Sequence, residues 1–203
     1  MTAVSHYPDL HRPGAFTREP LGWQPWLAPL DREQLTPRHY EGLIEEQRAG
    51  FAYFRLLARD PELLGARTRL DNDIFYNEDA GLPRAERELA ATAASRVNGC
   101  VFCASVHARA AAQLSGRGED VDRLLAEGTD ATLGERWDAI VAAAQALTTT
   151  PVAFGPEHVA RLRAAGLGDD EIHDVIGGAA FFNWANRLML SLGEPEVPAR
   201  RRS

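Results

Sequence analysis

The sequence has no lysine, so all 22 of its Lys and Arg positions are arginine. A chain without lysine cannot form a Schiff base with a carbonyl substrate, and it lacks the lysine that a P-loop requires. Its formal net charge is -7, and positive charge gathers only in the short run 200–202. Nucleic-acid binding needs a basic stripe, so that function class is excluded as well.

Long apolar runs are also missing. No window approaches ~18 consecutive apolar residues, so no membrane-spanning helix is predicted. The N-terminal segment MTAVSHYPDLHRPGAF lacks the basic start and apolar run of a secretory signal. With 203 residues, of which 45% are apolar and 25% charged, the composition is typical of a single soluble globular domain. We therefore expect a cytoplasmic protein.

Cysteine occurs only twice, at Cys100 and Cys103. A CxxC pair in such a chain is typical of redox or metal chemistry rather than of a disulfide framework. A zinc site needs about four ligands, yet no second CxxC exists, and His158 and His173 lie far away in the sequence. Free cysteines are often buried as small apolar residues, so an inert pair remains the alternative to a redox-active dithiol.

Helix signals dominate the chain, and no segment alternates apolar and polar residues for long enough to predict a strand. Thr36 and Asp60 are helix N-caps that each precede a proline, and Gly193 followed by Pro195 ends the last helix. We expect an all-α domain of about eight helices over residues 36–193, followed by a C-terminal tail, 194–203. The expected helices cover residues 37–59, 61–75, 81–97, 100–114, 119–127, 134–148, 156–165 and 169–192.

Residues 1–35 form a separate arm, rich in proline and tryptophan. Prolines at this density oppose regular helix. Phe16, Trp23, Trp26 and Leu27 make the arm too apolar for a free tail. We expect it to lie on a surface, either of its own domain or of a neighbouring subunit.

The segment NGCVFCASVH, residues 98–107, carries the main functional signal. On a helix that turns ~100° per residue, Cys100, Cys103 and His107 share one face, and three- and four-residue spacings let side chains meet. A nearby base or a helix N-terminus makes a cysteine reactive, because the thiolate is the nucleophile. The helix dipole favours Cys100 as the more acidic thiol, whereas an imidazole four residues on favours Cys103; we expect Cys103, since the dipole contributes only ~0.3–1 kcal/mol.

The break at Asn98-Gly99 determines whether His107 has a partner. If two helices fold back on each other there, Glu88 and His107 lie ~15 Å and ~12 Å from the turn, at similar heights. The carboxylate then meets the imidazole directly or through water. A Glu–His–Cys arrangement of this kind is a proton relay that can activate a nucleophile.

These four residues form the pattern E-x11-C-x2-C-x3-H within RELAATAASRVNGCVFCASVHARAA. The pattern resembles the alkyl hydroperoxide reductase D (AhpD) group of the carboxymuconolactone decarboxylase superfamily, particularly its peroxidase-related branch. The resemblance is close over about residues 80–115. The stretch GLGDDEIHDVIGGAAFFNWANRLMLSLG, residues 166–193, also resembles the final helix of that branch.

The resemblance implies an all-helical homo-oligomer (a dimer, trimer or hexamer) that reduces hydroperoxides with thiols and without haem or metal cofactors. Carried onto this chain, Cys103 is the peroxidatic thiol, Cys100 resolves it, His107 relays the proton and Glu88 is the base behind it. An external dithiol protein or a small thiol would be the reductant. The chain departs from the best-known AhpD proteins at Phe102, where they carry a second histidine, and an apolar neighbour raises a thiol pKa.

Two other functions fit the same residues less completely. A lactone decarboxylase of the same superfamily would need an acid–base site for a carboxylated substrate, and the CxxC would have no evident role in it. A non-enzymatic redox sensor or scaffold would use the disulfide to change its assembly. On the last helix, Asn183 and Arg187 lie four residues apart and can face the site or another subunit.

Overall fold

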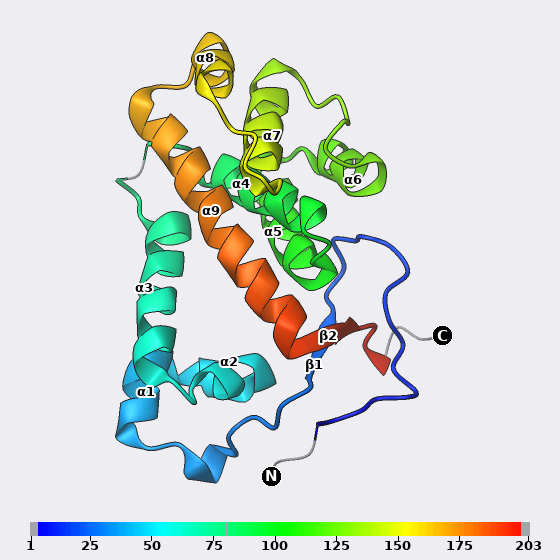
Figure 1. Cartoon of the computed structure of the whole chain (residues 1–203), viewed down its shortest axis with the longest axis vertical. Helices are drawn as coiled ribbons and strands as arrows, with labels where there is room; N and C mark the ends of the chain where they lie inside the picture. The colour runs from blue at the N-terminus through cyan, green and yellow to red at the C-terminus, as the bar shows by residue number, and fades with distance from the viewer. Residues whose placement is uncertain (1–3, 80, 200–203) are drawn as a thin grey trace.

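The structure is a computed structural model that describes residues 4–79 and 81–199. Within these residues the chain forms nine α-helices, two short 3-10 helices and one two-stranded sheet, which confirms the all-α prediction (Figure 1). In chain order the elements are β1 (Gly22–Pro25), η1 (Arg32–Gln34), α1 (Pro37–Leu43), η2 (Glu46–Gly50), α2 (Ala52–Leu57), α3 (Pro61–Tyr76), α4 (Arg84–Val97), α5 (Val101–Ser115), α6 (Gly118–Glu127), α7 (Glu135–Thr148), α8 (Pro156–Ala164), α9 (Asp169–Leu192) and β2 (Gly193–Glu196).

Helix α4 lies at the centre of the main core. Every residue from Glu86 to Ser95 is buried, and the helix packs against α5, α7 and α9. Small side chains make this possible, because the alanines at positions 90, 91, 93 and 94 let the neighbouring backbones approach closely. Figure 1 shows α9 running diagonally along the molecule between α3 and α4.

The single helix predicted over residues 37–59 is wrong, because the chain divides there into α1, η2 and α2. The break stands at Ile44, whose φ of 65° lies outside the helical region. Leu43, Ala49 and Ala58 pack together with Leu64 in a small second core. On one continuous helix Ala49 would lie ~120° around the axis from Leu43, whereas the bend at Ile44 lets both side chains pack into the second core.

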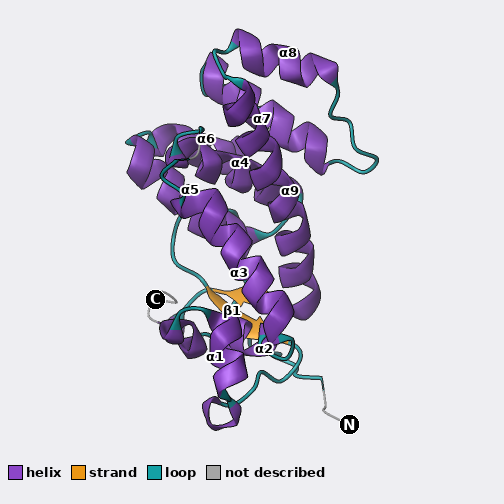
Figure 2. Cartoon of the chain, turned by 90° about the vertical axis from the view of Figure 1, so that its left-hand side faces the viewer, coloured by secondary structure: helices purple, strands orange, loops and turns teal. Residues whose placement is uncertain are grey.

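The sheet, which the sequence pattern does not predict, joins the two ends of the chain (Figure 2). β1 and β2 are antiparallel, with Trp23 opposite Pro195 and Gln24 opposite Glu194. Trp23 enters the main core and meets the ring of Tyr53 edge-on at 5.4 Å. Strands of four residues are too short for alternation to stand out.

The described part of the N-terminal arm packs on its own domain. Arg18 forms a two-point ion pair with Asp122 of α6, with both N–O distances 2.6 Å. The guanidinium of Arg96 lies over the ring of Phe16 at 4.3 Å. No helix among the described residues is long and apolar enough to cross a membrane.

The β1–β2 contact leads to a stability prediction. A Cβ at Gly193 would lie 2.3 Å from the Gln24 carbonyl oxygen and 2.4 Å from the Trp23 ring, so Gly193→Ala must push the strands apart. We expect a loss of about 1–3 kcal/mol in the free energy of unfolding, as for other overpacked sites. Urea denaturation measures it, with Gly14→Ala as the control, since nothing lies within 4 Å of a Cβ there. Equal stability of the two variants would contradict the prediction.

Candidate functional site

The turn at residues 98–99 folds α5 back along α4. Gly99 has a φ of 77°, a left-handed conformation that glycine adopts without steric cost. The N–H of Cys100 donates to the Ser95 carbonyl at 2.9 Å, and Cys100 then caps the N-terminus of α5. The two helices pack along their length, so the expected reversal is confirmed.

This packing brings Glu88 of α4 against His107 of α5. The Oε2 of Glu88 lies 2.6 Å from Nδ1 of His107, which confirms the predicted contact. The carboxylate is almost fully buried, and its Oε1 accepts a hydrogen bond from Nε of Arg84 at 3.3 Å. With Nδ1–H donating to the carboxylate, Nε2 is the nitrogen of His107 that can accept a proton.

Aromatic rings from two further helices hold the imidazole in place. Phe75 of α3 lies 5.0 Å from the His107 ring, and Phe182 of α9 lies 4.2 Å from it. Four helices therefore meet at this one side chain. Nothing in the spacing of the cysteine motif indicates these two rings.

The two cysteines are free thiols whose sulfur atoms lie 2.8 Å apart. An S–S bond is ~2.05 Å long, so a disulfide requires only a small approach. Cys100 is 1% exposed and Cys103 is 6% exposed, and of the two only Cys103 lines the neighbouring cavity. Access for a small oxidant thus favours Cys103.

Acidity favours the other thiol. The pKa of Cys100 is lowered, first by the hydrogen bond with the Cys103 thiol and then by backbone N–H groups of Cys103 and Phe102 at the start of α5. The pKa of Cys103 is raised, because its proton is shared with Cys100 and because it is buried. The two thiols titrate as a pair. Loss of the first proton leaves a thiolate, whose negative charge is favoured at the N-terminus of α5.

The pKa directions favour Cys100, as the helix-dipole argument does, rather than Cys103. Among the hydrogen bonds of the described residues, none joins His107 to Cys103. The bond that His107 makes is between its Nδ1 and Glu88. Helical spacing brought the two side chains to the same cavity without a hydrogen bond between them among the described residues. The first turn of α5 acts on Cys100 through its N–H groups as well as its dipole.

Asn186 of α9 is a site residue that sequence reasoning missed. It is fully buried, and its side chain hydrogen-bonds both cysteines, which lowers the pKa of each. Its Oδ1 accepts from Nδ2 of Asn98 at 3.1 Å, and its Nδ2 donates to Oγ of Ser95 at 3.0 Å. The amide is thus fixed with its N–H groups toward Ser95 and the sulfurs. Asn186 stands beside two other polar residues of this helix, Asn183 and Arg187, and nothing in the sequence distinguishes it from them.

The other two polar candidates on α9 do not reach the thiols. Asn183 contacts Asn98 and Thr148. Arg187 is exposed and donates back to the Asn183 carbonyl at 3.1 Å. Neither residue lines the cavity beside Cys103.

The cavity beside Cys103 has a volume of about 580 Å³. His107 and Glu88 line it together with a set of aromatic side chains. These aromatic residues are Trp23, Phe51, Tyr53, Phe54, Phe75, Tyr76, Phe102 and Phe182. The departure noted at Phe102 therefore belongs to an aromatic wall, to which the N-terminal arm and α2, α3, α5 and α9 all contribute.

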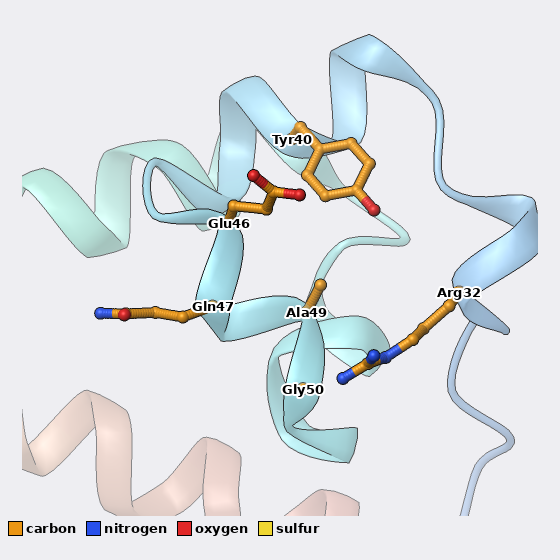
Figure 3. A pocket seen from close by; sticks show the side chains of 6 residues that line it. All are labelled: Arg32, Tyr40, Glu46, Gln47, Ala49 and Gly50. Atoms are coloured by element: carbon orange, nitrogen blue, oxygen red, sulfur yellow. The ribbon is translucent and has the colours of Figure 1, made fainter.

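A second hollow of about 350 Å³ lies between η1, α1 and η2, and it contains no thiol. Figure 3 shows Arg32 pointing across it toward Gly50, with Tyr40 and Glu46 on the other side. Within the described chain, no group of three or more His, Cys, Asp or Glu side chains gathers as a metal site requires. His158 accepts from the Gly155 N–H at 3.1 Å and stacks on Phe154, and His173 is exposed.

The contact of Asn186 with both sulfurs predicts a measurable shift in acidity. Asn186→Leu removes the amide donor, so we expect the midpoint of thiolate formation to rise, and at fixed pH below that midpoint less thiolate to be present. Ultraviolet absorbance of the thiolate during a pH titration measures this. Asn183→Leu is the matched control, since it also loses a bond to Asn98 but touches no sulfur. Equal midpoints for the two variants would show that Asn186 does not act on the thiols.

Comparison with known proteins gives the fold a context. Residues 61–148 match the carboxymuconolactone decarboxylase family. No curated protein is detectably similar to the chain in sequence.

Several solved structures share the fold. A peroxidase-related protein with an AhpD core from Ralstonia eutropha JMP134 is 23% identical, with a TM-score of 0.69 over 80% of this chain and 87% of that one. A peroxidase-related protein from Silicibacter sp. TM1040 is 26% identical, with a TM-score of 0.67 over 84% and 92%. The debrominase Bmp8 is 21% identical, with a TM-score of 0.65 over 81% and 88%. Because one fold carries enzymes that differ in their reactions, the chemistry must be argued from the site. The family match over residues 61–148 and these structures together show an AhpD-like fold and a similarity to the carboxymuconolactone decarboxylase family.

Proposed function

We propose that the protein is a thiol-dependent hydroperoxide reductase of AhpD type. One observation carries the proposal: a free dithiol with sulfurs 2.8 Å apart opens through Cys103 onto a cavity that also contains the Glu88–His107 pair. A nucleophile, a candidate proton carrier and space for a substrate thus occur together. That combination is what a thiol-based reduction needs.

The proposed cycle has three steps: oxidation of Cys103, formation of the disulfide, and reduction of the disulfide. The sulfur of Cys103 attacks the distal oxygen of a hydroperoxide, the O–O bond breaks, and the alkoxide leaves as an alcohol after taking up a proton. The resulting sulfenic acid condenses with the thiol of Cys100, which forms the disulfide and releases water. An external dithiol then reduces the disulfide by thiol exchange and is itself oxidised.

In this cycle the two thiols have different tasks. Cys100 holds negative charge, because the start of α5 and Asn186 lower its pKa, and at 2.8 Å it can accept the proton of Cys103 as that sulfur attacks. His107 faces the cavity, and its Nε2 takes up a proton from solvent and passes it to the leaving alkoxide. Glu88 orients the ring and stabilises its charged form, as a carboxylate does behind a catalytic histidine.

The proposal also includes a reductant, a homo-oligomeric assembly and a cytoplasmic location. The cycle requires a dithiol protein or a small thiol as reductant. The exposed apolar side chains of α3, Leu63 and Leu70, support assembly into a homo-oligomer. A reductant-dependent cycle also suits the cytoplasm, where thiols are kept reduced.

The assigned roles predict different outcomes for the two cysteine variants. Cys103→Ser should abolish consumption of a hydroperoxide with a dithiol donor. Cys100→Ser should still react once and leave a sulfenic acid on Cys103, because no neighbouring thiol condenses with it. Peroxide consumption, together with mass spectrometry of the peptide carrying both positions after dimedone trapping, measures both effects.

If activity survives in Cys103→Ser, or if dimedone labels Cys100 of the wild type, then Cys100 is the peroxidatic cysteine and the assignment above is wrong. Loss of turnover in every form, with a change in size on a column when reductant is removed, would instead identify a redox sensor.

The Glu88–His107 contact predicts a kinetic defect that is separable from stability. Glu88→Gln keeps the shape but removes the charge, so we expect kcat/KM for a hydroperoxide to fall about 10²-fold, at the lower end of general acid–base effects. Glu86→Gln is the matched control: Glu86 is buried on the same helix and pairs with Arg136 at 2.8 Å, away from the cavity. It should lower the Tm and leave kcat/KM of the folded protein unchanged. Equal kcat/KM values for both variants would remove Glu88 from the mechanism.

A further inference from the structure

The cavity beside Cys103 is much larger than a hydrogen peroxide molecule. Its volume is about 580 Å³, whereas a water molecule occupies ~30 Å³ of liquid. Pockets of ~300–1,000 Å³ bury most of the surface of a drug-sized organic molecule. A site that served only hydrogen peroxide would leave most of this space without a function.

The wall favours a ligand that contains a ring. Eight aromatic side chains line the cavity, among them Phe102, next to the nucleophile, and Phe75 and Phe182, which flank the imidazole. Aromatic rings pack against one another in edge-to-face or offset arrangements. Trp23 and Tyr53 already meet in this way at 5.4 Å. A planar apolar body can make the same contacts.

The charges of the wall favour a neutral ligand. Four charged side chains line the cavity, and they form two pairs: Arg67 Nη1 with Asp71 Oδ2 at 3.1 Å, and Arg84 Nε with Glu88 Oε1 at 3.3 Å. A carboxylate in the cavity would therefore find both arginines already paired with a carboxylate, and it would lie near two negative charges. Burying an ion without a counter-charge is strongly unfavourable.

Arg67 nevertheless offers a hydrogen-bond donor. Its side chain is about nine-tenths buried, and its Nε has no hydrogen-bond partner. The guanidinium lies over the rings of Phe181 and Phe54, at 5.4 and 5.8 Å, and it is close enough to Cys103 to favour the thiolate. A buried N–H without an acceptor is costly, and an oxygen of a bound ligand beside Cys103 would supply that acceptor.

A second donor stands near the same thiol. Tyr53 lines the cavity and interacts electrostatically with Cys103. Burial raises its pKa, so the phenol keeps its proton and can donate it in a hydrogen bond. The two donors provide a place for the oxygens of a hydroperoxide next to the sulfur.

We propose that the cavity selects neutral, ring-bearing organic hydroperoxides, with the peroxide oxygens hydrogen-bonded by Arg67 and the ring packed among the aromatic side chains. The reactive step rests on the proposed function: the distal oxygen passes to Cys103, and the ring-bearing alkoxide leaves as its alcohol after protonation. The selection of the ligand is a property of the cavity alone, so a binding measurement tests it without turnover.

The binding test uses the reduced wild-type protein and three alcohols in calorimetric titrations. Cumyl alcohol is the neutral aromatic probe, tert-butanol lacks the ring, and the para-carboxylate of cumyl alcohol adds a charge. We expect cumyl alcohol to bind at least about tenfold more tightly than either of the others. Equal affinity for the carboxylate would overturn the neutral class, and equal affinity for tert-butanol would overturn the requirement for a ring.

Two arginine variants test whether cumyl alcohol binds in the cavity beside Cys103. Arg67→Gln should weaken cumyl alcohol binding about tenfold, as expected for a lost charged hydrogen bond. Arg69→Gln, an exposed arginine on the same helix and outside the cavity, should leave it unchanged. If Arg67→Gln fails to fold, Ala110→Phe tests the same cavity by filling part of it. It should lower the ratio of kcat/KM for cumene hydroperoxide over hydrogen peroxide about tenfold, and an unchanged ratio would overturn the proposal.

The failures of the two proposals can be told apart. Turnover of hydroperoxides without any binding of cumyl alcohol would refute the selection and leave the peroxidase standing. Binding of cumyl alcohol without turnover of cumene hydroperoxide would refute the reaction and leave the neutral, ring-bearing ligand class.

Discussion

The contact between Glu88 and His107 depends on the whole α4–α5 pair. A carboxylate and an imidazole 2.6 Å apart must be placed by two helices that run antiparallel and very close together. Gly99 supplies the left-handed turn, and the alanines of α4 supply the small surface that allows the approach. The contact in turn fixes which nitrogen of His107 is available to the cavity. If the helices separated by the width of one larger side chain, the imidazole would lose its contact with Glu88 and with it its orientation.

One cysteine has the lowered pKa, and the other one lines the cavity. Cys100 lies at the start of α5, where backbone N–H groups and Asn186 stabilise an anion, but it has no opening to the cavity. Cys103 has the opening, while burial raises its pKa. A shared proton links the two properties, since negative charge held at one sulfur is available to the other over 2.8 Å. In the proposed cycle, Cys100 thus holds negative charge for Cys103 although it does not itself line the cavity.

The sequence allowed much of the fold and part of the site to be predicted. Helices with strong start and stop signals, such as α3 after Asp60-Pro61 and α9 before Gly193, were located within a residue or two. The Glu88–His107 contact was predictable because the chain reverses at Asn98-Gly99. Two residues at similar sequence distances from that turn then lie at similar heights along the two antiparallel helices. The bend at Ile44 was not, because a second small core imposes it against local helix preference.

The unpredicted parts of the site come from distant segments. Asn186 acts across 86 residues of sequence from Cys100, and Phe75 and Phe182 reach His107 from helices α3 and α9. Arg67 and Tyr53 carry no motif of their own. The hydrogen bonds that act on the two thiols were also not predictable, because helical spacing gives the direction of a side chain but not the partners it finally bonds to.

The sheet that joins the two ends of the chain has a consequence for assembly of the site during synthesis. Leu21, Gly22 and Trp23 form part of the cavity wall, and β1 is held by pairing with residues 193–196. Contacts this distant in sequence form late, because a long loop must close first. On the ribosome the hairpin that carries both thiols can fold before the wall around it is complete. The cavity is therefore completed only when the last helix and β2 have emerged, so a partly made chain carries its thiols without their full enclosure.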